Sequence, residues 1–93
     1  MTPIAAEQYL TLEAGGFTYA GLPSRIVRAI HHARGAGAPP ELGAFMRAEL
    51  AGVGATTDPA GDDARACAAF LGALVSAGRA RVVKYGPAVR ELN

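Results

Sequence analysis

The sequence predicts a mainly α-helical domain that ends in a small C-terminal β-hairpin, and three observations support this prediction. Apolar residues recur at helical spacing in several stretches, and glycine and proline separate these stretches. The chain contains 21 Ala, the strongest helix former, against 22 Val, Ile, Leu, Met and Phe together. Near the C-terminus a strand-like stretch is followed by Gly86-Pro87, a turn sequence. With 93 residues and few large apolar side chains, residues 1–93 are expected to form one domain around a thin core.

The first predicted helix covers residues 3–14. Thr2-Pro3 has the sequence of an N-cap followed by proline at the first helical position. Several of the apolar residues that follow fall on one helical face, and Gly15-Gly16 ends the pattern. Residues 17–20 alternate like a strand, but this segment is short, so we expect one edge strand or an extended connector there.

Three further helices are predicted, at residues 23–34, at 39–51 and in a third segment that ends before Gly78. The third segment has two alternative starts. Asp58-Pro59 is an N-cap followed by proline, whereas the residues after it can delay the regular helix to about residue 63. The predicted core residues lie on the apolar stripes of these helices: Ile26, Ile30, Phe45, Leu71 and Leu74.

The predicted hairpin consists of a strand over residues 79–85, the turn at Gly86-Pro87 and a returning strand over residues 88–92. Because side chains alternate along a strand, Arg79 and Arg81 are expected on one face and Lys84 on the other.

Residues 71–86, LGALVSAGRARVVKYG, resemble the end of a winged helix-turn-helix domain. In that superfamily an apolar helix that ends at a glycine leads into a two-stranded wing rich in Arg and Lys. The predicted helices at 23–34 and 39–51 fit the order of elements in that superfamily. The resemblance implies a winged-helix-like α+β fold and a regulatory or accessory function in DNA binding.

The helix before the wing usually reads bases, but in this chain its outward face carries mostly Ala and Gly. DNA contacts are therefore expected mainly with phosphates, for which the forked guanidinium of arginine is suited. The alternative interpretation is that these cations form ordinary solvated faces. The candidate nucleic-acid-binding residues are Arg25, Arg28, Arg34, Arg79, Arg81, Lys84 and Arg90.

The small side chains on the last predicted helix support a second hypothesis, a protein-interaction module. Short side chains let a partner approach closely, and the segregation of charge along the chain provides a rim that orients it. Such a module could be an inhibitor or an adaptor, for example a phage-encoded anti-CRISPR or host-takeover protein. Because helical surfaces built on small side chains often continue into a partner, a homodimer is also expected. Frequent Ala can instead reflect helix propensity only. The candidate partner-binding residues are Arg65, Ala69, Gly72, Ala73, Ser76 and Tyr85.

No motif in the sequence indicates an enzyme, a cofactor or a small-molecule substrate. Adjacent residues on a helix point about 100° apart, so His31-His32 cannot chelate one ion, and we expect one ring at the apolar edge and the other in solvent. Cys67 is expected to be a buried, inert thiol, and Asp62-Asp63 to cap a helix rather than bind metal. A net charge of +1 argues against a nucleic-acid binder whose whole domain is strongly basic. The lack of a signal peptide and of a long apolar run leads us to expect a cytoplasmic protein without a membrane contact.

Overall fold

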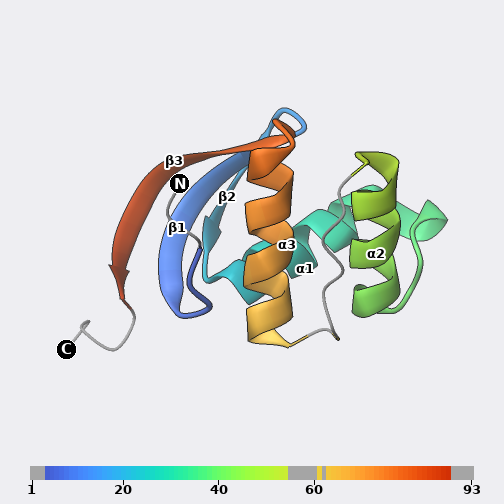
Figure 1. The fold of residues 1–93 in the computed structure, drawn as a ribbon, viewed down its shortest axis with the longest axis horizontal. Coiled ribbons are helices and arrows are strands. Elements are labelled where there is room, and N and C mark those ends of the chain that lie inside the picture. The colour runs from blue at the N-terminus through green and yellow to red at the C-terminus, as the bar shows by residue number, and fades with distance from the viewer. Residues whose placement is uncertain (1–3, 55–60, 62, 89–93) are drawn as a thin grey trace.

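The computed structural model describes residues 4–54, 61 and 63–88 of the chain. It has an α+β architecture, in which a three-stranded antiparallel sheet is covered on one face by helices (Figure 1). The strand order is β2-β1-β3, so the first and last strands in the sequence are neighbours. In chain order the elements are β1 (Gln8–Ala14), β2 (Phe17–Gly21), α1 (Pro23–Arg34), a 3₁₀ turn (Gly35–Gly37), α2 (Leu42–Gly52), α3 (Ala64–Ser76) and β3 (Ala80–Ala88).

The prediction of a mainly α-helical, winged-helix-like fold with a C-terminal hairpin is wrong. The segment predicted as the helix 3–14 contains β1, which is the central strand of the sheet. In this strand Leu10 and Leu12 are fully buried, whereas Glu13 is exposed, so the segment follows a period of two rather than the helical period. Pairing with strands on both sides decides the conformation of β1, and no local signal reports that pairing.

Gly15-Gly16 connects β1 and β2 as a two-residue hairpin turn instead of ending a helix. Both glycines have positive φ angles, 58° and 84°, as the turns that favour tight β-hairpins require. β2 (Phe17–Gly21) forms an edge of the sheet, which confirms the first of the two alternatives predicted for residues 17–20.

β3 confirms a strand after Gly78, but its partner is different from the one predicted. Gly86 and Pro87 continue the strand, which pairs antiparallel with β1 from Ala80 to Ala88, and they do not form a turn. A Cβ atom on Gly86 would lie 3.0 Å from Cδ1 of Tyr9, so close packing against β1 explains this glycine. Most of the predicted returning strand, 88–92, lies outside the described residues.

The three remaining predicted helices are confirmed: α1 has the predicted bounds 23–34, and the bounds of α2 and α3 differ from the predicted ones by a few residues. Asp63 is the N-cap of α3, and its Oδ1 accepts a 2.8 Å hydrogen bond from the Ala66 N–H. The later of the two predicted starts therefore agrees with the structure, while Asp58-Pro59 lies outside the described residues. Gly35 ends α1 with a φ of 77°, as a glycine C-cap does.

The core lies between the sheet and the helices. Leu10 and Leu12 of β1 belong to one buried cluster with residues of α1, α2 and α3. α1 and α3 pack against the sheet on this face, while α2 packs on α1 and α3 and lies on the far side of α3 from the sheet (Figure 1). The five predicted core residues are all at most 5% exposed. No helix in the described part of the chain is both long and apolar enough to cross a bilayer.

Candidate functional site

An open groove of about 1490 Å³ runs along α3. Its floor is formed by small side chains of α3, because this helix turns its large apolar residues toward the core. One wall is formed by β3, and the segment Ile4–Glu7 contributes to the lining. Val53 and Gly54, which follow α2, reach the groove as well. The groove therefore joins residues from both ends of the sequence.

All six residues proposed from the sequence for partner contact line this groove. Five of them lie on α3, and the sixth, Tyr85, comes from β3. Ala69 and Ser76 are exposed, while Gly72 and Ala73 are partly buried. The helical spacing of these α3 residues brings them onto one face, and the pairing of β3 with β1 brings Tyr85 to the same groove.

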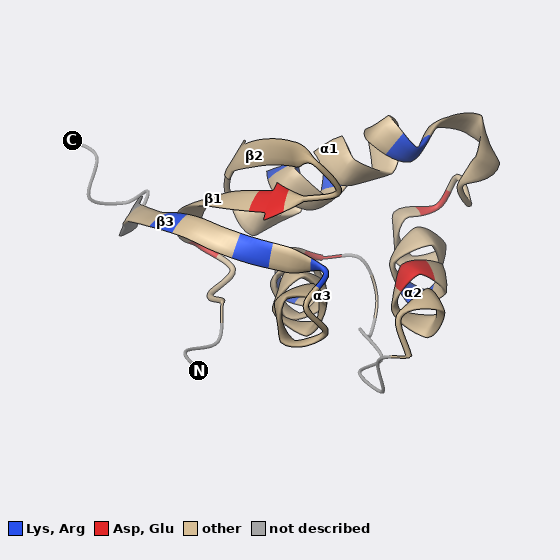
Figure 2. Cartoon of the chain, turned by 90° about the horizontal axis from the view of Figure 1, so that it is seen from above, with Lys and Arg blue, Asp and Glu red and all other residues tan. Residues whose placement is uncertain are grey.

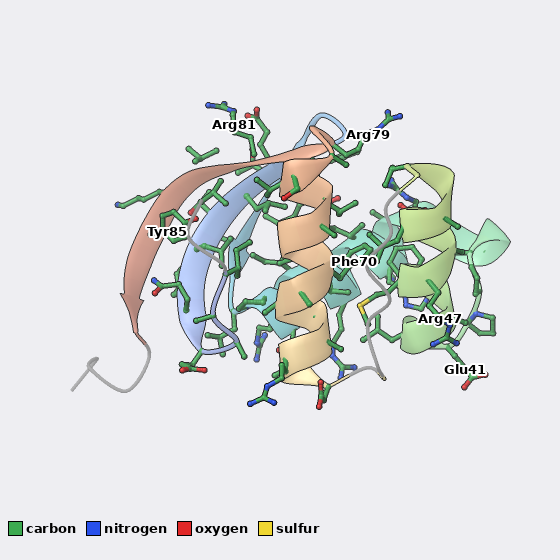
Figure 3. The ribbon with its side chains drawn as sticks, viewed as in Figure 1. Glu41, Arg47, Phe70, Arg79, Arg81 and Tyr85 are labelled. Atoms are coloured by element: carbon green, nitrogen blue, oxygen red, sulfur yellow. The ribbon has the colours of Figure 1, made fainter. Side chains whose placement is uncertain are left out.

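Tyr85 provides a large aromatic surface beside this small-residue floor. Its register partner on β1 is Leu10, a fully buried residue, so Tyr85 points to the helical face of the sheet. The residue is nevertheless 51% exposed, and Figure 3 shows it on the part of β3 that lies away from α3. A half-exposed aromatic ring beside a groove is typical of a contact surface, since such rings combine apolar area with a hydrogen-bonding hydroxyl.

Three charged residues border the groove: Glu7, Arg65 and Arg81. The Arg81 guanidinium donates a 3.0 Å hydrogen bond to the Glu13 carboxylate on β1. The two side chains are 70% and 47% exposed, so solvent screens this ion pair and a competing carboxylate can replace Glu13 at little cost. Arg65 is exposed at the first turn of α3.

The candidate nucleic-acid-binding cations are distributed over several elements. Arg25 and Arg28 are exposed on α1, and Arg34 at the end of that helix donates two hydrogen bonds, of 2.9 and 3.2 Å, to Glu49 of α2. These hydrogen bonds raise the pKa of the Arg34 guanidinium above its usual value, while partial burial opposes the shift. Arg34 is thus engaged in linking two helices. Arg90 lies outside the described residues.

The predicted arrangement of the cations near the C-terminus is wrong. Arg79 precedes β3, and Figure 3 shows that Arg79 and Arg81 point away from each other. Arg81 and Lys84 instead share the outer face of the sheet, because they pair with Glu13 and Thr11 of β1. The cause is a register shift at Val82–Lys84, where β3 has one residue more than β1. A β-bulge of this kind has no reliable sequence signal.

The other polar candidates have structural positions. His31 stacks on Phe45 with ring centroids 4.4 Å apart, and its Nε2 lies 2.6 Å from the Pro39 carbonyl oxygen, whereas His32 is exposed. This confirms the prediction of one histidine at the apolar edge and the other in solvent. Cys67 is fully buried, as predicted. Among the described residues, no three His, Cys, Asp or Glu side chains come together in a way that could hold a metal ion.

Sequence reasoning missed two parts of the groove wall. Val82 is a register partner of Leu12 on the helical face, and its position follows only from the pairing of β3 with β1. Ile4 packs against the core from the segment predicted as a helix. The sequence signal that could have identified Ile4 as a packed residue was its large apolar side chain, which is followed by the small residues Ala5 and Ala6. No protein-family model, curated protein or solved structure matches the chain. What is known of the groove and of the cations therefore rests on the structure of this chain alone.

Proposed function

We propose that this protein is a protein-interaction module that receives a partner in the groove between α3 and β3. One observation carries the proposal: six residues chosen for partner contact from the sequence line a single open groove in the structure. The floor of small side chains allows close approach, and Tyr85 and the bordering charges supply aromatic contact and orientation. The proposed role is binding without catalysis, as in a cytoplasmic inhibitor or adaptor.

DNA binding receives less support from the same geometry. A phosphate-binding surface needs several cations on one face, but Arg34 is paired with Glu49 and Arg79 points away from Arg81 (Figure 3). We therefore place the function in the groove.

The proposal is tested by blocking the groove with one long side chain. Ala69 is exposed and lines the floor, so Ala69→Arg fills the space that a partner needs without disturbing the core. The tagged protein is used to capture partners from a lysate of its own organism, and the captured protein is identified and titrated against the purified variants. We expect Ala69→Arg to weaken this binding by at least about 100-fold, as for a blocked central contact.

The matched control is Ala29→Arg, which adds the same side chain to an exposed position on α1, outside the groove. It should bind as the wild type does. A partner that binds equally well to wild type and Ala69→Arg would contradict the proposal. Salt-sensitive binding of random duplex DNA with no protein partner would also contradict it and would return the function to nucleic acid.

A further inference from the structure

The strand that borders the groove is also an open edge of the sheet. β3 occupies a terminal position in the order β2-β1-β3, so one of its edges is hydrogen-bonded to β1 and the other has no strand beside it in the described part of the chain (Figure 1). β3 is nine residues long, against five for β2 at the opposite edge. Apart from the bulge at Val82–Lys84 and Pro87, which has no N–H, this edge presents backbone N–H and C=O groups to which an extended chain can bind.

The two faces of β3 offer different side chains to a chain that pairs with it. On the helical face lie Val82 and Tyr85, which are part of the groove lining. On the outer face lie Arg81 and Lys84, and Val83 at the bulge is 50% exposed. Figure 2 shows that the charged residues along β3 are all basic, with no acidic residue on the strand.

We propose that β3 binds an extended acidic segment of another protein as a fourth strand of the sheet. This inference rests on the proposed function, because it names the kind of partner that enters the groove. In an added strand, alternate side chains face alternate sides. Apolar side chains of the partner would lie beside Val82 and Tyr85 on the helical face, where β3 forms the wall of the groove, and acidic ones would pair with Arg81 and Lys84 across the outer face.

Charge also distinguishes this partner from a second copy of the chain. Two β3 strands placed side by side would bring together Arg79, Arg81 and Lys84 from each copy with no acidic residue between them. Like charges opposite each other destabilise a strand pair, and basic edge strands are a common protection against self-association. An acidic segment removes this repulsion, so the same cations that oppose a dimer favour the proposed partner.

The test uses synthetic probes and the intact protein. Fluorescence anisotropy measures the binding of a labelled ten-residue peptide of alternating glutamate and valine. The first comparison peptide replaces glutamate with lysine, and the second keeps every glutamate but replaces three valines with proline, which removes backbone donors. We expect binding of the first peptide only, with slower exchange of amide hydrogens of β3 over residues 80–86 when it is bound.

Two matched double variants distinguish specific pairing of the peptide with the cations of β3 from a general attraction between the acidic peptide and a basic protein surface. Arg81→Ala with Lys84→Ala removes the two cations on the outer face of β3, whereas Arg25→Ala with Arg28→Ala removes the same charge from α1. We expect the first double variant to weaken binding of the acidic peptide by about tenfold. The second should change it by less than about twofold, since exposed charges at a distance are screened by salt.

Equal binding of the proline peptide, or equal weakening by the two double variants, would overturn the inference. A dimer of the wild-type protein that Val83→Pro abolishes in sedimentation would assign the edge to a second copy and would overturn it as well. These failures differ from failure of the groove itself. If Ala69→Arg still blocks the captured partner but the acidic peptide does not bind, strand addition is wrong and the groove proposal stands.

Discussion

The two faces of α3 carry side chains of different size and burial. One face carries Phe70, Leu71 and Leu74, which are at most 5% exposed and join the core (Figure 3 shows Phe70 between α3 and α2). The other face carries Ala69, Gly72 and their neighbours, which form the floor of the groove. The same helix therefore supplies stability through one face and open space through the other.

This difference shows how a small chain can separate folding from binding. Large apolar residues are scarce in this sequence, and in α3 they are placed on the face that meets the sheet and α2. The groove face has small side chains, and the described part of the chain leaves it open. Substitutions on the two faces are accordingly expected to differ in size and in sign.

The largest effect is expected from Leu74→Ala on the core face. Removing a buried leucine side chain leaves a cavity and should lower the free energy of unfolding by roughly 2–5 kcal/mol. Chemical denaturation followed by circular dichroism measures this change. If Leu74→Ala unfolds at the same denaturant concentration as the wild type, the assignment of this face to the core is wrong.

The second-largest loss of stability is expected at the N-terminus of α3, because both faces of this helix require that the helix forms. Asp63→Ala removes the side-chain acceptor of the Ala66 N–H and should cost about 1 kcal/mol. Asp63→Asn provides the control, because an asparagine side chain also caps a helix and should retain most of the stability. Thermal melts of the three proteins give the comparison. Equal losses for the two variants would show that charge, and not capping, is what Asp63 contributes.

A stabilising change is expected on the groove face. A Cβ atom at Gly72 would meet no atom within 4 Å, and alanine is favoured over glycine in a helix, so Gly72→Ala should raise the free energy of unfolding by about 0.5–1 kcal/mol. The added methyl group projects into the groove and should weaken partner binding in the titration described above. A melting temperature below that of the wild type would mean that this side of α3 is packed.

The smallest effect on stability is expected from Ala69→Lys. Lysine is a good helix former and Ala69 is exposed, so the free energy of unfolding should change by less than about 0.5 kcal/mol. Denaturant titration alongside Leu74→Ala measures both faces under the same conditions. A loss approaching that of Leu74→Ala would remove the distinction between the two faces.

The three helices could be predicted from the sequence because their signals are local. Each has an apolar stripe at helical spacing, and glycines such as Gly35 mark their ends. The six groove residues could be chosen for a related reason, since five of them share one face of a helix whose register the apolar stripe sets. The sequence did not show that these five residues lie in a groove or that Tyr85 lies beside them. Both facts depend on the position of β3.

The sheet could not be predicted from the sequence in the same way, because β1 and β3 pair over a long distance in the sequence. Residues 8–14 have few β-branched side chains and follow a helix-start sequence, yet they form the centre of the sheet because β3, some seventy residues later, pairs with them. The same pairing continues β3 through Gly86 and creates the bulge that places Arg81 and Lys84 on one face. Composition and helical periodicity thus determined the helices and the core residues on them, and Gly35 marked the end of α1. The sheet, the open edge of β3 and the groove were decided only by the tertiary structure, because backbone pairing between distant segments has no local sequence signal.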